Sequence, residues 1–200
     1  MSKFTAIWAV SRTLQLLLDT QIGADPQFAG GPPVPVSLLS PKAIREPGSV
    51  VPGSSVSIWL YRVTRNEYTL NNRPDRTVPN QVPHLSIPIN LDYLITPMNE
   101  DPEAQQVVLG KVLQVFNDHA ILRGSDLQES LRGTTEQLRL SLETLTLEEL
   151  TQVWYSLQEP YQLSVSYLVQ VVTIESSLEP ALAPPVLVRN STYDQILASQ

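Results

Sequence analysis

Cysteine is absent from this chain of 200 residues, which excludes disulfide bonds, zinc–thiolate sites and thiol nucleophiles. Glycine is scarce, with 8 residues, and no P-loop, G-x-G-x-x-G or nucleophile-elbow motif occurs. The close backbone approach that phosphate groups require is therefore not indicated. No run comes near the roughly 18 apolar residues of a membrane span, so no segment is expected to insert into a bilayer by itself.

Positive charge is also scarce. Lysine and arginine number 13 against 20 acidic residues, which gives a net charge of -7. This balance opposes binding to phosphate backbones or to anionic membrane surfaces, so nucleic acid is not an expected partner. Hydrophobic residues, by contrast, make up 42% of the chain and suffice for one core, while 17 prolines predict several irregular segments.

The first half of the sequence predicts one helix and three strands. Apolar residues recur at helical spacing over about residues 3–20, and Arg12 and Asp19 interrupt the apolar run that a secretory signal would need. The helix is expected to dock on the core through one stripe: Phe4, Ile7, Trp8, Ser11, Leu14, Leu17 and Leu18. A Gly- and Pro-rich loop over residues 22–33 leads to a short strand at 34–39, and a second loop follows.

The next two strands are long. Residues 55–64 alternate in the β pattern, and we expect a central or nearly central strand there. Its two faces carry Val56, Ile58 and Leu60 on one side and Trp59, Tyr61 and Val63 on the other. Turn residues follow, and a further strand is predicted over residues 85–95, where Pro88 belongs at an edge, a bulge or the strand's start.

The second half predicts two helices with strong start signals and two strands. Asp101 is the expected N-cap of the first helix, whose buried stripe is Val108, Val112, Val115 and Phe116. After a strand over residues 138–142, Thr146 and Glu149 have capping-box spacing, and Leu145 and Leu150 have the spacing of a hydrophobic staple. The core-facing residues of this second helix are expected to be Leu147, Leu150, Val153, Trp154 and Leu157, and a last strand runs from Tyr161 to about Ile174.

This order of elements predicts an α+β domain whose mainly antiparallel or mixed sheet is flanked by about three helices. We expect the domain to span residues 1–178 and an extended, proline-rich arm to span 179–200.

Reactive side chains form no recognisable constellation. A metal site would need His84 and His119 joined by a carboxylate such as Asp92 or Asp118, but their spacing matches no metal motif. The acidic residues Glu100, Asp101 and Glu103 are what the N-terminal dipole of a helix favours, so we interpret them as capping rather than as a cation site. No catalytic residue, cofactor or metal is indicated, and no enzymatic activity is expected.

Four arginines gather in and after the strand at 55–64, in an otherwise acidic protein: Arg62, Arg65, Arg73 and Arg76. Exposed charges often contribute little, and a solvated loop would explain the cluster. The alternative is a protein interface, where arginine is enriched for its planar set of donors. These four arginines are therefore the candidate protein interface.

Four segments together resemble the N-terminal domain of the cap, or tail-terminator, proteins of extracellular contractile injection systems, which are phage-tail-like particles. They are "SIWLYRVTRNEYTLNNRP", "SIPINLDYLIT", "LGKVLQVFNDHAIL" and "LRLSLETLTLEELTQVWYSLQEPYQLSVSYLVQVVTIES". The resemblance covers about residues 3–176. Its most specific part is the leucine-rich strand, the helix around Trp154 and the strand Tyr161 to Tyr167, in that order.

The resemblance implies a tail-terminator fold and a hexameric ring that ends the inner tube and contacts the sheath. It also implies assembly in the cytoplasm into a particle that is then released or anchored. An open tube end exposes strand edges that template further addition, and a ring can cover them by β-augmentation without any reactive group.

Two other functions remain open at this point. The same architecture would suit a connector or baseplate adaptor elsewhere in a contractile tail. A metal-dependent hydrolase using His84, His119 and Asp92 is the alternative from another class.

Overall fold

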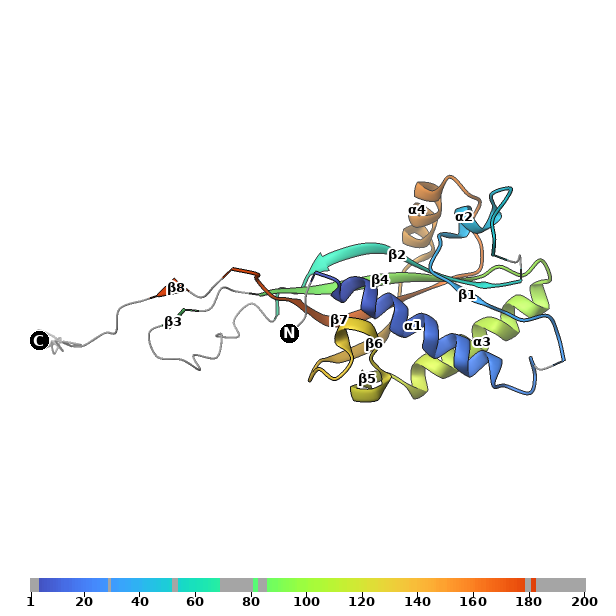
Figure 1. The fold of residues 1–200 in the computed structure, drawn as a ribbon. Coiled ribbons are helices and arrows are strands. Elements are labelled where there is room, and N and C mark those ends of the chain that lie inside the picture. Colours follow the sequence, from blue (N-terminus) through green and yellow to red (C-terminus); the bar gives the residue numbers. More distant parts are fainter. Residues whose placement is uncertain are drawn as a thin grey trace, which may run out of the picture.

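The computed structural model describes residues 4–28, 30–51, 54–68, 81–82, 86–178 and 181–182. Within these ranges, helices accompany one six-stranded sheet and a separate pair of short strands (Figure 1). The α-helices are α1 (Ala6–Gly23), α2 (Pro41–Arg45), α3 (Pro102–Asp118) and α4 (Leu147–Leu157). The strands are β1 (Val36–Ser37), β2 (Val56–Arg65), β3 (Gln81–Val82), β4 (Ile87–Pro97), β5 (Ile121–Arg123), β6 (Gln137–Glu143), β7 (Val165–Ile174) and β8 (Ala181–Leu182).

The six-stranded sheet has the order β1-β2-β4-β7-β6-β5. Every neighbouring pair is antiparallel except β1 and β2, which run parallel. Because β1 and β2 are parallel, the chain between them must cross over, and α2 lies in that crossover. The α+β class and the mixed, mainly antiparallel sheet predicted from the sequence are confirmed.

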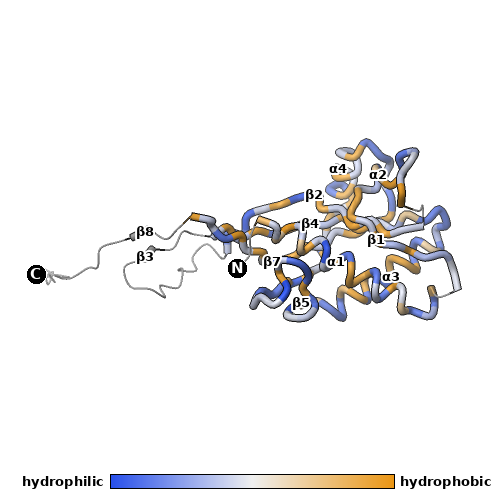
Figure 2. The backbone as a smooth tube through the Cα atoms, in the orientation of Figure 1, coloured by the Kyte–Doolittle hydropathy of each residue, from blue (hydrophilic) through white to orange (hydrophobic). Residues whose placement is uncertain are grey.

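Helices α1 and α3 cover one face of the sheet and enclose the main core (Figure 1). Leu14 and Leu18 of α1 are fully buried there, and all four residues of the predicted α3 stripe are buried. Phe116 of α3 meets Tyr167 of β7 edge to face, with ring centroids 4.8 Å apart. Hydrophobic and hydrophilic stretches alternate along α1 and α3 in Figure 2, as expected of helices with one buried side.

The opposite face of the sheet is covered by α4 over a smaller area. Trp154 and Leu157 of α4 pack against Leu94 of β4, and the indole Nε1 of Trp154 donates to Ser164 Oγ at 3.0 Å. Their predicted burial is confirmed. Leu147 was expected in the same stripe but is 65% exposed, because the cluster reaches along α4 only as far as Leu150.

Helix α1 differs from its predicted packing at its first turn. Ser11, Leu14 and Leu18 are buried as expected, and Ser11 Oγ lies 2.8 Å from the hydroxyl of Tyr93. Phe4 and Trp8, however, are 83% and 52% exposed. The amphipathic pattern therefore continues beyond the part of the helix that the core can cover.

Two short elements lie where loops were expected. In α2, the Ser40 side chain accepts a hydrogen bond from the backbone of Ala43, and Pro41 occupies the first turn. β5 pairs with β6 over only three residues. The strand β2 was expected to be central or nearly so, but it is the second strand from the edge, and its outer neighbour β1 is two residues long.

Beyond the large sheet, β3 pairs with β8. Because β3 precedes β4 and β8 follows β7, this pair continues the pairing of β4 with β7. Figure 1 places this pair, the β3–β8 ribbon, well away from the helices. The boundary between a domain at 1–178 and an arm at 179–200 stays a prediction. No helix in the described ranges is long and apolar enough to cross a membrane.

Candidate protein interface

A β-bulge decides which side chains β2 presents. Leu60 is opposite Tyr93 of β4, but Arg62 is opposite Asp92, so Tyr61 is an extra residue in β2. After the bulge the alternation of faces is shifted by one residue. Val63 therefore returns to the core side, opposite Leu91, and its predicted place beside Trp59 and Tyr61 is wrong.

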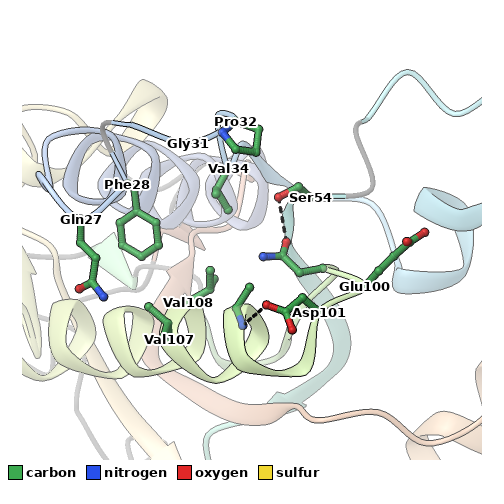
Figure 3. A pocket seen from close by; sticks show the side chains of 12 residues that line it. Gln27, Phe28, Gly31, Pro32, Val34, Ser54, Glu100, Asp101, Val107 and Val108 are labelled. Atoms are coloured by element: carbon green, nitrogen blue, oxygen red, sulfur yellow. Dashed lines mark hydrogen bonds between the residues drawn. The ribbon is translucent and has the colours of Figure 1, made fainter.

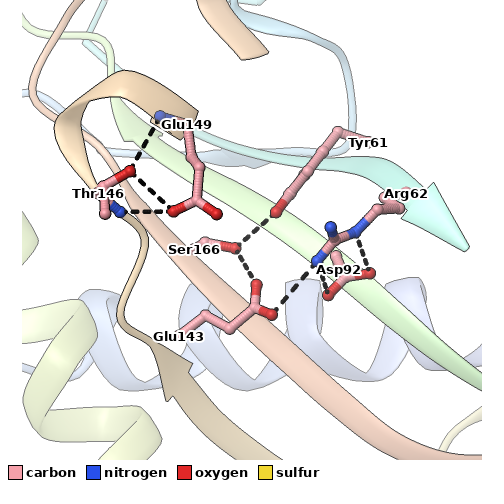
Figure 4. A network of polar contacts seen from close by, with 7 residues as sticks. All are labelled: Tyr61, Arg62, Asp92, Glu143, Thr146, Glu149 and Ser166. Carbon is pink, nitrogen blue, oxygen red and sulfur yellow. Dashed lines mark hydrogen bonds and ion pairs between the residues drawn. The ribbon is translucent and has the colours of Figure 1, made fainter. Parts of the chain in front are cut away.

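The same bulge places Arg62 on the face opposite the main core, where it meets two carboxylates (Figure 4). Its Nε donates to Asp92 Oδ2 at 3.0 Å, and its second nitrogen reaches Asp92 Oδ1 and Glu143 Oε1, each at 3.3 Å. The Asp92 side chain is only 1% exposed, whereas that of Arg62 is 48% exposed. The hydrogen bonds that Arg62 donates to Asp92 are the main cause that raises the pKa of the Arg62 guanidinium.

Two hydroxyls extend this cluster, which we call the Arg62 network. Ser166 Oγ donates to Glu143 Oε2 at 3.0 Å, because an ionised carboxylate can only accept. The Tyr61 hydroxyl lies 3.0 Å from Ser166 Oγ and completes a chain from β2 to β7 to β6. Burial is the largest influence on Tyr61 and raises its pKa, so the phenol stays neutral and remains a donor.

In the Arg62 network, the charge of Arg62 is balanced within one molecule by the carboxylates of Asp92 and Glu143. The network ties β2, β4 and β6 together across the face that α4 leaves open. Arg65, the last residue of β2, is exposed. Arg73 and Arg76 lie outside the described residues, so the grouping of the four arginines stays a prediction.

The alternative metal site is not assembled in the described part of the chain. Asp92 is bound by Arg62, and the Nδ1 of His119 lies 3.0 Å from the Val115 carbonyl of its own helix. His84 lies outside the described residues. Among those that are described, no three His, Cys, Asp or Glu side chains are grouped as metal ligands.

A pocket of about 630 Å³ lies between the loop after α1 and the first turns of α3 (Figure 3). Phe28, Val34 and Val108 are among the apolar side chains that line it, and Asp101 stands at its rim. The Asp101 carboxylate accepts from the backbone of Glu103 and Ala104, at 3.3 and 3.1 Å, so it caps α3 as predicted. The Asp101 charge therefore stabilises the helix end, and the pocket lining combines apolar side chains with polar ones such as Gln27 and Asn99.

The outer edge of β2 is the feature that sequence reasoning missed. β1 pairs with Val56 and Ser57 only, after which the chain turns into α2 at its N-cap Ser40. Within the described ranges no strand pairs with β2 on this side beyond Ser57. Only the strand order could have revealed this, because the alternating pattern of an edge strand and a central strand is the same.

The direction of the β2 backbone groups can be assigned. The Val56 amide donates outward to the Pro35 carbonyl, so Leu60, an even number of residues further, also faces outward. Beyond the bulge, the Asn66 amide donates inward to Pro88 of β4, so Arg65 and Val63 face outward. We call this backbone edge, from Leu60 to Arg65, the β2 slot.

Helix α1 flanks the β2 slot. Gln15 Nε2 donates to the Val36 carbonyl at 2.7 Å, and Asp19 Oδ1 accepts from the Val36 amide at 2.8 Å, so this side of α1 faces β1. Trp8 precedes Gln15 by seven residues, which is about two helical turns, and so lies on the same side. Trp8 is half exposed, so it is a large apolar side chain on the β1-facing side of α1 that the core does not fully cover.

The family described as the Pvc16 N-terminal domain matches residues 9–187. No curated protein matches the sequence.

Two solved structures are similar in fold. One is an extracellular contractile injection system, the PVC sheath/tube terminator in its extended state, with 19% identity and a TM-score of 0.59 over 100% of this chain and 67% of that chain. The other is the anti-feeding prophage cap, described as the AFP tube terminating cap, with 18% identity and a TM-score of 0.57. That match covers 92% of this chain and 60% of the cap chain. At these identities the likeness is one of fold.

Proposed function

This chain belongs to the Pvc16 N-terminal domain family, and from that membership we propose that it caps a contractile injection system by terminating the inner tube. The observation that carries the proposal is the family match over residues 9–187. It is supported by the fold, which is similar to a sheath/tube terminator and to a tube terminating cap.

In this proposal the chain acts as a subunit of a closed ring, hexameric as the sequence resemblance implies, that contacts the tube protein and the sheath protein. The ring assembles in the cytoplasm on a particle that is later released or anchored. Its role is structural. A head-to-tail ring needs two different surfaces on each subunit, and the β2 slot on one border and the β3–β8 ribbon beyond the sheet are two such surfaces.

The proposal is tested by deleting the gene and measuring particles by electron microscopy. Loss of a terminator should give tubes of irregular length, and a plasmid copy should restore a single length. Loss of a connector or a baseplate part should give no particle at all, so that result would favour the other role. Purified protein mixed with tube subunits should form closed rings on tube ends, and a strictly monomeric protein that ignores those ends would contradict the proposal.

A further inference from the structure

The β2 slot is an incomplete sheet border. Leu60, Val63 and Arg65 each direct one amide and one carbonyl away from β4, toward a position where the described chain places no strand. An exposed edge of this kind is a template for a further strand. The bulge at Tyr61 and the charge of Arg65 disfavour pairing between the β2 edges of two copies. A different strand that fits the bulged edge is therefore favoured as the guest.

The side chains around the slot favour an apolar guest strand. Val63 is 48% exposed on the α1 side of the sheet, and Trp8, on the β1-facing side of α1, is 52% exposed. A strand that paired with β2 would lay alternate side chains against these two residues. Both would then become buried, and each apolar side chain removed from water contributes to binding.

The chain itself contains a segment with the required chemistry. Residues 186–193, with the sequence "VLVRNSTY", hold β-branched and aromatic residues and no proline. They follow β8, which ends at Leu182 and lies away from the helices in Figure 1. At about 3.3 Å per residue, the four steps from Leu182 to Val186 span up to about 13 Å, so the guest strand would enter a molecule that adjoins the β3–β8 ribbon.

We propose that the β2 slot receives residues 186–193 of a second copy of this chain as an added strand. This inference rests on the proposed ring, because it makes each copy a donor at one end and an acceptor at the other. Such a contact is heterologous, and it closes into a ring when the rotation between copies allows it. Main-chain hydrogen bonds supply the affinity, and Trp8 and Val63 select an apolar strand.

The absence of native cysteine allows a direct test with the full-length protein. One copy carries Val63→Cys and a differently tagged copy carries Val188→Cys, and the mixture is treated with a short bismaleimide. We expect cross-linked pairs that contain one copy of each tag. Their yield should exceed, by about tenfold, that of a control mixture in which Leu142→Cys replaces Val63→Cys, because pairing raises the effective concentration of the two thiols.

Leu142 is a matched control because it is 54% exposed on β6, away from the β2 edge. Yields equal to that control would overturn the proposal. A cross-link that forms only when both cysteines are on the same chain would overturn it as well, since the strand would then come from the same molecule.

A second variant tests the backbone pairing. With Arg65→Cys as the reporter thiol, adding Val63→Pro removes an outward amide but no bond to β4, so the fold should be retained. The cross-link to Val188→Cys should fall to the control yield, whereas Val63→Ala should leave it largely unchanged. An unchanged yield with Val63→Pro in a folded protein would rule out strand addition at this edge.

These measurements need no tube. If cross-linking fails while the protein still sets tube length, this inference is wrong and the proposed function stands. If cross-linking succeeds while deletion of the gene leaves tube length unaffected, the proposed function is wrong and the strand addition stands.

Discussion

A single extra residue, Tyr61, determines what the exposed face of β2 offers. Without the bulge, Arg62 would follow the alternation of Ile58 and Leu60 and point into the main core. With the bulge, Arg62 points to the other face and binds Asp92, which is nearly inaccessible to water. The guanidinium serves as the counter-charge for a buried carboxylate, which is the condition under which a buried charge is tolerated.

Removing that counter-charge should destabilise the protein. We expect Arg62→Met to lower the free energy of unfolding by about 1–3 kcal/mol, a range that allows for the partial exposure of Arg62. Urea unfolding of Arg62→Met, Asp92→Asn and the double variant measures the coupling. The double variant should lose less than the sum of the single losses, and simple additivity would show that the pair is not coupled.

Of the remaining arginines of the cluster, Arg65 is exposed, and Arg73 and Arg76 lie outside the described residues. If the three form a protein interface, changing them together to glutamate should weaken binding to tube or sheath subunits while the melting temperature stays nearly constant, because the sequence predicts a turn for residues 73 and 76 and charges on turns contribute little to stability. Pull-down with purified subunits and a thermal scan give the two readouts. Arg132→Glu is the control on another surface, and unchanged partner binding in the triple variant would remove the arginine cluster as an interface.

At the scale of elements, α4 begins with a complete capping box. Thr146 Oγ1 accepts from the Glu149 amide at 3.2 Å, and Glu149 Oε2 accepts from the Thr146 amide at 2.8 Å. These bonds lower the pKa of the Glu149 carboxyl, mainly through the backbone of Thr146. The contribution of Glu149 to stability is therefore complete above the pKa of the unfolded chain and is lost as the pH falls through the lower pKa of the folded protein.

We expect Thr146→Ala to lower the free energy of unfolding by about 1 kcal/mol at neutral pH. The difference from the parent should shrink as the pH falls through the lowered pKa of the Glu149 carboxyl, where this partner of Thr146 becomes protonated. Denaturant unfolding across this range measures the change. Glu149→Gln should remove the pH-dependent part alone, and a difference that does not vary with pH would mean that the carboxylate does not act through the cap.

Long helices and strands could be predicted from the sequence because each repeats its own spacing of buried residues several times. The Thr146 capping box, the Asp101 cap and the stripe of α3 are set by neighbouring residues, and the structure has them as expected. α2 has five residues and β5 has three, so each holds little more than one period of its pattern, too little to distinguish it from a loop. The exposure of Trp8 depends on how far the sheet extends beneath α1, which is a tertiary property.

The candidate site was less accessible to sequence reasoning. The arginine cluster could be read from the sequence, but the partner of Arg62 lies 30 residues away, and the pairing of β2 with β4 together with the bulge brings the two side chains close. The open border of β2 depends on the strand order and on the early end of β1. Neither can be recognised in the residue pattern of β2 itself.

At the scale of the whole molecule, the β3–β8 ribbon stands apart from the body that contains the core. It pairs over two residues, and an isolated two-stranded ribbon is at best marginally stable in water. We expect its amides in the free protein to exchange with solvent far faster than those of β4 and β7, and to become protected in assembled rings. Hydrogen–deuterium exchange measured before and after assembly gives this comparison, and equal protection in both states would show that the ribbon is not a contact surface.

The connection of the ribbon to β4 and β7 has a mechanical consequence. These two strands are the middle pair of the sheet; β4 also pairs with β2 over residues 89–97, and β7 also pairs with β6 over residues 166–170. Sheet hydrogen bonds lie across the strand direction. Tension applied through the ribbon would therefore pull both strands lengthwise and load many hydrogen bonds at the same moment, instead of opening them one after another.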